Sequence, residues 1–417
     1  MSGRTSAALA DAPSPFERHK AQLIALFQKV QALSREPDAN RLLGLEIQEE
    51  LILRISAAER SIQRSRKVVA GIKKALSSQR NTKAQSRVLK ARMVRVQNGI
   101  QGKRDLIDLL RDIGDCIAFI YVDRFDLKPL AFREAPGFIT GKVGARLERA
   151  ILRAVYRRDA VGILNDLTHT VRHGDVMVLA KDRPLMLIEA KSGRGGKRSR
   201  TDRQMAAANT MMDYLTTDVR EEDGGVWRRV ATGQPFVSHG LVAAEMIRAL
   251  PDAGWLTREV ERGLHYILID CSADYNFAEV FGGLVVDARP FVLSVNGMKA
   301  HQLGYYPFPL SFDDPAATFR FYNGEFVMFV VADLTYMTSA LRDAGWFLEV
   351  MEDDRMPFKV GPLGSETATE GISFVGFHVL GRLAAEFASL DWILTNVMTG
   401  EMPEALVAEL TRQAEAS

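Results

Sequence analysis

The segment Leu185–Gly193, LMLIEAKSG, ends an apolar run with a carboxylate and an ammonium group two positions apart. Side chains alternate between the two faces of a strand, so Glu189 and Lys191 project from one face at the end of this run. Such side chains are almost never buried without a partner. Asp175 precedes Asp182 by seven residues and Glu189 follows it by seven, in a stretch with the composition of a hairpin turn. A hairpin centred on Asp182 would therefore place Asp175 directly opposite Glu189.

Two opposed carboxylates require a compensating charge. Directly opposed residues have Cβ atoms about 5 Å apart, so one carboxylate must be protonated or a cation must lie between them. A hard divalent cation with oxygen ligands meets this need, and we expect Mg²⁺, or Mn²⁺ in its place. The ammonium of Lys191 suits an anionic substrate or the attacking water. This arrangement matches metal-assisted phosphodiester cleavage. The alternative is a plain hairpin with a salt-bridged Glu189–Lys191 pair at its rim.

The motif resembles a known family. His173-Gly-Asp175, thirteen intervening residues and then Glu189-Ala-Lys191 resemble the PD-(D/E)XK nuclease superfamily, with Gly174 in place of the usual proline. The resemblance covers about residues 141–271. It implies a restriction-endonuclease-like α/β core, in which a four-stranded mixed sheet is flanked by helices. It also implies Mg²⁺ bound by Asp175, Glu189 and the carbonyl group of Ala190, with Lys191 as the catalytic lysine.

The same resemblance adds two further candidates and a partner. Glu148 matches an acidic residue that many members contribute from the helix before the first strand. Gln204 is placed to match a glutamine that some members carry in the helix after the motif. An even number of active sites suits cleavage of both strands, so a homodimer is expected from the family; an accessory protein is a further candidate partner.

A basic loop follows the motif directly. Glycine and serine between residues 192 and 203 are typical of a flexible surface loop. Beside a phosphodiester site, the loop is better interpreted as a clamp on the substrate backbone. Its basic residues are Arg194, Lys197, Arg198, Arg200 and Arg203.

Residues 16–115 are expected to form a long antiparallel helical hairpin. Apolar residues such as Ile55, Ile62, Ile100 and Ile107 recur at helical spacing on either side of a polar break at 77–82. No acidic residue occurs between positions 60 and 104, which hold 14 Lys and Arg. This run indicates contact with a phosphate backbone, or alternatively with an acidic protein surface. The representative contact candidates are Lys73, Lys74, Arg87 and Lys90.

Four regions are expected along the chain: a disordered tail (1–15), the helical hairpin (16–115), the nuclease-like domain (116–290) and an α+β accessory domain (291–417). The nuclease-like domain is expected to contain a helix within 141–159 and a second within 199–218. Its expected strands are Val161–Leu164, Asp175–Leu179, Leu185–Lys191 and His265–Asp270.

Charge and composition limit the class of protein. Residues 1–203 carry a net charge of +18 and residues 204–417 a net charge of −16, so the first half suits a polyanionic partner. Two cysteines exclude a cysteine-rich zinc module and favour a reducing compartment. The sequence contains no signal-peptide pattern and no apolar run of 18 residues, which favours the cytoplasm.

Three weaker patterns were considered. Gly137–Lys142 (GFITGK) resembles a phosphate-binding loop, but it is one residue short and is followed by Val143, so ATP binding is not expected. His169 and His173 are expected to have structural roles rather than to contact substrate. Asp166 is a minor candidate for a further acidic ligand.

These patterns predict a Mg²⁺-dependent nuclease with DNA as the favoured substrate; by analogy, a role in bacterial restriction or anti-phage defence is suggested. An RNA nuclease, or a non-catalytic nucleic-acid-binding protein with a vestigial nuclease core, remains open.

Overall fold

The computed structural model contains two compact units. It describes residues 14–78, 81–127, 130–131, 137–142, 144–181, 183, 185–190, 210, 213–222, 225–228, 234–282, 284, 290–299, 304–353, 356–367 and 372–398. Unit 1 comprises Met1–Arg228 and Gln302–Glu325, and unit 2 comprises Arg229–His301 and Phe326–Ser417. All but two residues of the expected tail, 1–15, lie outside the described residues.

This division differs from the expected boundaries at 116 and 290. The helices α10 (Phe308–Phe312) and α11 (Pro315–Asn323) return to unit 1 and pack against α1 (Lys20–Arg35). The hydroxyl group of Tyr322 donates a hydrogen bond of 3.0 Å to Asp112 in this unit. Long-range packing, which local periodicity does not encode, therefore assigns this late segment to the first unit.

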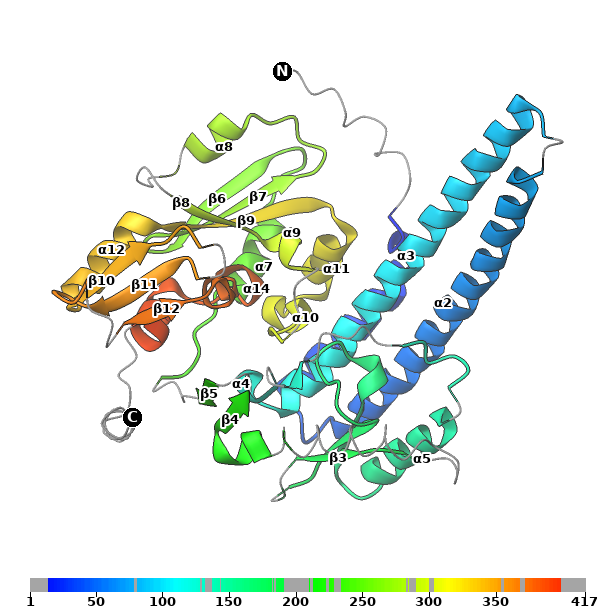
Figure 1. Cartoon of the computed structure of the whole chain (residues 1–417), viewed down its shortest axis with the longest axis horizontal. Coiled ribbons are helices and arrows are strands. Elements are labelled where there is room, and N and C mark those ends of the chain that lie inside the picture. The colour runs from blue at the N-terminus through cyan, green and yellow to red at the C-terminus, as the bar shows by residue number, and fades with distance from the viewer. Residues whose placement is uncertain are drawn as a thin grey trace. The chain divides into compact units, whose positions relative to one another are not determined.

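The helical hairpin predicted from the sequence is present. The helices α2 (Arg41–Leu76) and α3 (Lys83–Tyr121) run antiparallel and side by side (Figure 1). A reciprocal capping box between Thr82 and Gln85 begins α3, because each side chain accepts the other residue's backbone N–H. Burial is concentrated away from the hairpin tip, which begins after Leu76. Buried members of the predicted apolar stripe are Leu51, Ile55, Ala58, Ile62, Ile72, Ile100, Ile107 and Leu110.

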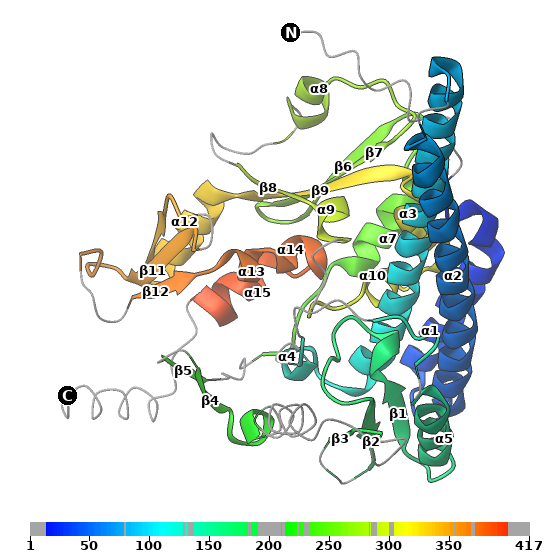
Figure 2. The same ribbon diagram turned by 45° about the vertical axis from the view of Figure 1, so that its right-hand side comes forward.

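A small sheet lies at the other end of this hairpin. In unit 1, α5 (Ala145–Tyr156) is followed by β1 (Val161–Leu164), the 3₁₀ turn η3 (Asn165–Leu167), β2 (Val176–Leu179) and β3 (Met186–Ile188). The strands pair antiparallel in the order β1-β2-β3. Both α5 and β1 contact α2, at the end of the hairpin opposite its tip (Figure 2).

The expected four-stranded mixed sheet was wrong in its details. The three-stranded sheet is entirely antiparallel, and the fourth expected strand belongs to another sheet. That segment forms β7 (Leu264–Asp270), which pairs with β6 (Trp255–Glu261) and β9 (Phe326–Asp333) in unit 2. An apolar run is compatible with any buried sheet, so its composition could not specify its partner strands.

Unit 2 has α+β architecture. Its larger antiparallel sheet has the order β6-β7-β9-β8, with β8 at Pro290–Ser294, and a smaller sheet has the order β10-β11-β12. The smaller sheet contains Trp346–Val350, Phe358–Pro362 and Ser373–Val375. The helices of unit 2 are α7 (Gly240–Ala249), α8 (Phe277–Gly282), α9 (Val295–Met298), α12 (Leu334–Asp343), α13 (Phe377–Leu380), α14 (Arg382–Ala385) and α15 (Leu390–Ile393), followed by the π-helical turn η5 (Leu394–Met398).

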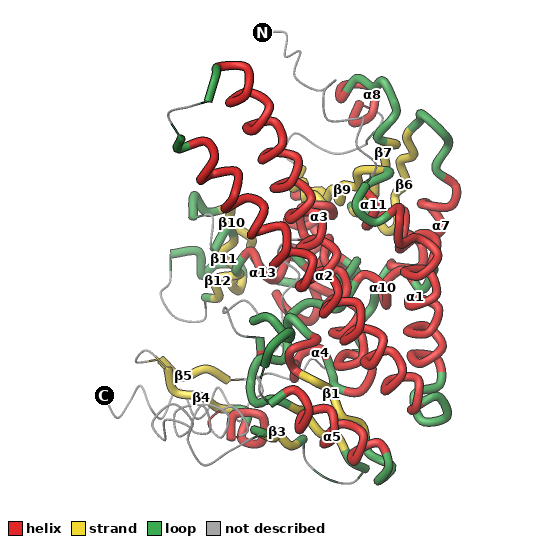
Figure 3. The backbone as a smooth tube through the Cα atoms, turned by 90° about the vertical axis from the view of Figure 1, so that its right-hand side faces the viewer, coloured by secondary structure: helices red, strands yellow, loops and turns green. Residues whose placement is uncertain are grey.

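The remaining short elements of the described residues belong to unit 1. They are η1 (Glu17–His19), α4 (Arg124–Leu127), β4 (Val219–Glu222) and β5 (Gly225–Arg228). Figure 3 distinguishes helices from strands by colour. Among the described residues, no helix is both long and apolar enough to cross a membrane.

Candidate functional site

The pairing of β2 with β3 ends beside Asp175. Val176 pairs with Ile188 and Met177 with Leu187, which is the register predicted from the symmetric spacing about Asp182. The regular ladder stops at this pair, because the backbone N–H of Asp175 also donates to the carbonyl oxygen of Ile188, at 2.8 Å. The direct opposition of Asp175 and Glu189 stays a prediction.

Asp175 is held in place by both of its carboxylate oxygens. Its Oδ2 atom accepts a hydrogen bond of 2.8 Å from the backbone N–H of Ala190. Its Oδ1 atom lies 2.9 Å from the Nζ atom of Lys142. The first contact ties the carboxylate to the segment after β3, and the second connects it to the loop before α5.

Three carboxylates converge on the ammonium group of Lys142. Besides Asp175, its Nζ atom lies 2.8 Å from Asp166 Oδ2 and 3.0 Å from Glu148 Oε1. Glu148 comes from α5, Asp166 from η3 and Asp175 from the residue before β2. We call Lys142, Glu148, Asp166 and Asp175 the Lys142 cluster. Asp175 and Glu148 are acidic ligands expected from the sequence, and Asp166 is the minor candidate for a further one.

Burial gives the cluster unusual protonation properties. The side chain of Glu148 is only 7% exposed, and this burial raises its pKa; Lys142 opposes the shift, whereas Asp175 and Asp166 reinforce it. Burial alone would lower the pKa of Lys142. Hydrogen bonds to Asp166, Asp175 and Glu148 outweigh it and raise that pKa instead. The lysine is therefore held as a cation among these carboxyl groups.

The helical hairpin fixes the loop that carries Lys142. Glu59 of α2 is fully buried, and its two carboxylate oxygens accept the backbone N–H groups of Ile139 at 3.0 Å and Thr140 at 2.7 Å. Arg111 of α3 donates to the carbonyl oxygens of Gly137 at 3.0 Å and Asp166 at 3.3 Å. The helical hairpin therefore holds the Lys142 loop in place and also forms a basic arm, the run of Lys and Arg between positions 60 and 104.

The turn before β2 requires glycine. Gly174 has φ +74°, which is favourable for glycine but inaccessible to proline, whose ring holds φ near −65°. The side-chain amide of Asn165 donates to the carbonyl oxygens of Gly174, at 3.0 Å, and of His173. The backbone N–H of Asn165 also donates to the carbonyl oxygen of Asp175 at 3.1 Å. Glycine therefore stands where the resembled family usually has proline because this backbone conformation excludes proline.

The carboxylate oxygens of the cluster are ligands of the type that a hard cation prefers, but their distances from the central nitrogen are those of contacts to an ammonium group. Among the described residues, no group of three or more His, Cys, Asp or Glu side chains is arranged to hold a metal ion. Carboxylate oxygens bind Mg²⁺ at about 2.0–2.1 Å, whereas those of the cluster lie 2.8–3.0 Å from the lysine nitrogen. The ammonium would therefore have to leave, and the oxygens move inward, before a metal ion could bind there.

No family model, curated protein or solved structure matches this chain. The geometry of the chain's own residues is therefore the basis for inferring its function.

Several predicted residues cannot be placed. Lys191 and Gln204 lie outside the described residues, as do all five basic residues of the loop at 194–203. Glu189 is half-buried beside Ala190. The four candidates for contact with a phosphate backbone, Lys73, Lys74, Arg87 and Lys90, are exposed near the hairpin tip. They lie far from the Lys142 cluster, because 14 residues of helix separate Glu59 from Lys73, which corresponds to about 20 Å.

Lys142, Glu59 and Arg111 are site residues that the sequence did not predict. Lys142 stands out in the sequence only as part of an imperfect phosphate-binding loop. Glu59 carried a usable signal, because it follows Ile55 by four residues and precedes Ile62 by three, which places a carboxylate on the buried stripe of α2. A buried carboxylate needs hydrogen-bond donors, so this position could have indicated a contact with another segment.

His169 has the structural environment that its sequence suggested. Its Nε2 atom contacts the carbonyl oxygen of Asp108 at 3.0 Å, and burial lowers its pKa to about 4. Its backbone N–H and that of Thr170 donate to the two carboxylate oxygens of Asp115, at 3.1 and 3.0 Å. These contacts attach the segment before the motif to α3.

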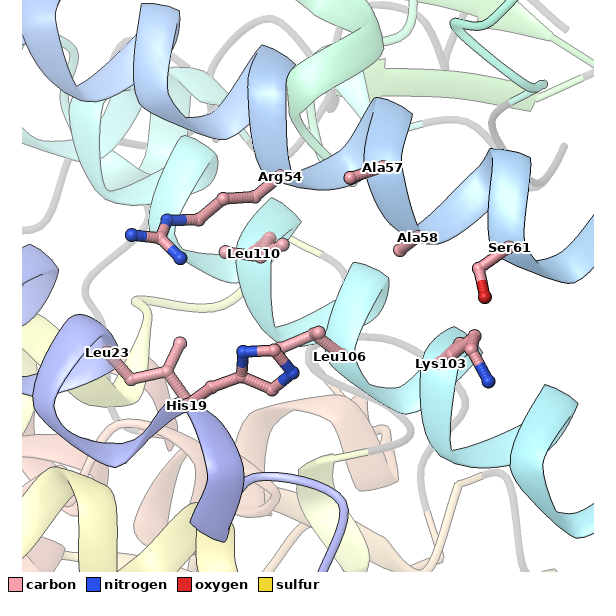
Figure 4. Close-up of a pocket in the computed structure, with 9 residues that line it drawn as sticks. All are labelled: His19, Leu23, Arg54, Ala57, Ala58, Ser61, Lys103, Leu106 and Leu110. Atoms are coloured by element: carbon pink, nitrogen blue, oxygen red, sulfur yellow. The ribbon is translucent and has the colours of Figure 1, made fainter.

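A separate cavity of about 290 Å³ lies between α1, α2 and α3 (Figure 4). Leu23, Leu106 and Leu110 contribute to an essentially apolar lining, and Arg54 and Lys103 are at its edges. No carboxylate lines it within the part of the chain that the structure describes. Its chemistry therefore differs from that of the Lys142 cluster.

Proposed function

We propose that this protein is a metal-dependent phosphodiester hydrolase acting on nucleic acid, with DNA as the favoured substrate. The observation that carries the proposal is the position of Asp175. It directly precedes the last paired residue of β2, Val176, and shares one cationic group with Glu148 and Asp166. Acidic side chains from three separate elements thus meet beside the motif that resembles the PD-(D/E)XK nucleases.

The proposed ligands of Mg²⁺ or Mn²⁺ are Asp175, Glu189, Glu148 and the carbonyl oxygen of Ala190. Asp166 adds a fourth carboxylate close to this set. When bound, the metal would polarise a phosphoryl oxygen and lower the pKa of a bound water. Lys191 is proposed to stabilise the charge that develops on the phosphate, and Gln204 to assist in positioning.

Two changes in the protein must precede metal binding: displacement of Lys142 from Asp175 and deprotonation of Glu148. The Ala190 N–H holds one oxygen of Asp175, so the other oxygen can exchange Lys142 for a different cation without loss of the hydrogen bond. The buried Glu148 has a raised pKa and must be deprotonated before it can bind a cation. Metal affinity should therefore increase with pH.

Lys142 also supports a second candidate, a nucleic-acid-binding protein without catalytic activity. Its ammonium already compensates part of the negative charge of the cluster. An ion-pair cluster of this kind can have a purely structural role. The basic arm and a second copy or an accessory partner would then account for the function.

Cleavage assays distinguish these candidates. Purified protein is incubated with plasmid DNA, linear DNA or RNA, in Mg²⁺ or in EDTA. We expect Mg²⁺-dependent cleavage of DNA that is lost in Asp175→Asn and retained in Glu46→Gln, a control at an exposed carboxylate on α2. Cleavage that persists in Asp175→Asn would refute the proposed site. Absence of cleavage of every substrate would favour the binding protein, and cleavage of RNA alone would change the substrate class.

A further inference from the structure

A basic cavity adjoins the Lys142 cluster. Its volume is about 260 Å³, and it lies between α2, the loop 139–142 and the first turns of α5. Among the described residues, its lining includes four cationic side chains and no acidic one: Arg60, Lys142, Arg146 and Arg149. Lys142 thus contributes to both the basic cavity and the acidic cluster.

The three arginines of the cavity have no compensating carboxylate among the described residues. Within the part of the chain that the structure describes, the guanidinium groups of Arg60, Arg146 and Arg149 contact no carboxylate. Neighbouring arginines differ, because Arg153 of the same helix lies 2.7 Å from Glu49 and Arg41 lies 2.7 Å from Asp159. Like charges around one cavity repel each other, so an anion bound among them would relieve this repulsion.

The start of α5 strengthens the preference for an anion. Ala145 and Arg146 are the first two residues of this twelve-residue helix, and both line the cavity. The N-terminal end of a helix carries a partial positive charge that attracts anions. Planar guanidinium groups match the oxygens of a phosphate in particular, because each can donate two parallel hydrogen bonds.

We infer that this cavity is a subsite for a backbone phosphate of nucleic acid, and that Lys142 exchanges the carboxylates for that phosphate. The inference rests on the proposed function in its choice of substrate. Lysine has a flexible four-carbon stem and a compact charge, which suits such an exchange. Movement of the ammonium to the phosphate leaves Glu148, Asp166 and Asp175 with an uncompensated charge. Binding of the substrate would thereby favour entry of a divalent cation.

The subsite is tested by binding in EDTA, where metal-dependent cleavage does not occur. The affinity of a fluorescent DNA duplex is measured at several salt concentrations for the wild type and for Arg60→Ala and Arg146→Ala. We expect each variant to bind about five- to tenfold more weakly at low salt, with a salt slope smaller by about 1. Arg153→Ala is the matched control, since it removes the same charge from the same helix outside this cavity, and its affinity should remain within about twofold of the wild type.

Unchanged affinity and salt slope in both arginine variants would overturn the subsite, as would the absence of DNA binding by the wild type at low salt. An equal loss in Arg153→Ala would also overturn it, because the effect would then be one of net charge. A duplex of RNA in the same assay tests the sugar preference separately. Since binding is measured without metal, failure of this inference is distinguishable from failure of the catalytic proposal, which depends on cleavage.

Discussion

Lys142 and Asp175, 33 positions apart in the chain, meet through a 2.9 Å contact between Nζ and Oδ1. The same ammonium contacts Asp166 and Glu148. Asp175 in turn accepts the backbone N–H of Ala190, the residue after Glu189. A cation from one loop thus contacts two of the carboxylates, Asp175 and Glu148, that the sequence motif led us to expect around a metal ion.

Replacement of Lys142 by methionine should destabilise the protein in a way that Mg²⁺ corrects. The variant leaves three carboxylates near one another without their shared cation, and we expect a loss of about 1–3 kcal/mol, because solvent reaches the 32% exposed lysine and screens the charges. Saturating Mg²⁺ should restore about 2–3 kcal/mol when its free concentration is about 100-fold above Kd. Urea unfolding with and without Mg²⁺ measures both effects.

Lys29→Met is the matched control for this experiment. Lys29 is 35% exposed and lies 3.3 Å from Glu50 and 3.8 Å from the more exposed Glu46, so it has similar exposure but contacts two carboxylates in place of three. Lys29→Met should lose less unfolding free energy than Lys142→Met, and Mg²⁺ should not change that loss. If Lys142→Met also gains no stability from Mg²⁺, the carboxylates do not form a divalent-cation site.

Replacement of Glu59 by glutamine should weaken the connection between the hairpin and the Lys142 loop. An amide offers only one acceptor oxygen to the N–H groups of Ile139 and Thr140, and its own NH₂ group would face a donor. We expect a loss of about 2–4 kcal/mol from the free energy of unfolding, measured by urea titration. Glu49→Gln is a control on the same helix, because Glu49 makes an exposed ion pair with Arg153 and its replacement should cost under about 1 kcal/mol. Equal losses in the two variants would contradict the role assigned to Glu59.

Replacement of Gly174 by alanine should strain the turn that positions Asp175. The residue has φ +74°, and an added Cβ atom would lie 3.2 Å from the carbonyl oxygen of Ile188. The left-handed conformation costs a non-glycine residue about 1–2 kcal/mol, so a lower midpoint of thermal unfolding is expected. Gly71→Ala tests the opposite case, because an added Cβ there meets no atom within 4 Å and alanine favours the interior of α2. It should stabilise the protein by about 0.5–1 kcal/mol; a stabilising effect of Gly174→Ala would contradict the strained turn.

Asp115 and His169 should affect the pH dependence of stability in opposite directions. Burial raises the pKa of Asp115 to about 7, so the folded state binds an extra proton between about pH 4 and 7 and loses stability there as pH rises. Burial lowers the pKa of His169 to about 4, so the unfolded state binds the extra proton between about pH 4 and 6.5 and stability rises with pH. The two contributions largely cancel across their shared range.

Asp115→Asn should therefore expose the contribution of His169. Relative to the wild type, the slope of unfolding free energy against pH should become more positive by up to about 1.4 kcal/mol per pH unit between pH 4 and 6.5. Urea unfolding at a series of pH values measures this difference, to which titrating groups common to both proteins do not contribute. Parallel curves for the two proteins would show that Asp115 has the same pKa in the folded and unfolded states.

Local patterns in the sequence determined the helical hairpin, strands β1 to β3 and the register in which β2 pairs with β3. Each depends on a short-range period: heptad-like spacing for the helices, apolar runs for the strands, and equal spacing on both sides of Asp182 for the register. Only the tertiary structure placed Leu264–Asp270 in a different sheet, returned 302–325 to unit 1 and brought Lys142 among three carboxylates. Such contacts join residues far apart in the chain, and their stability comes from burial and charge compensation that no local period records. The motif therefore indicated where chemistry could occur, whereas the fold determined which cation lies there.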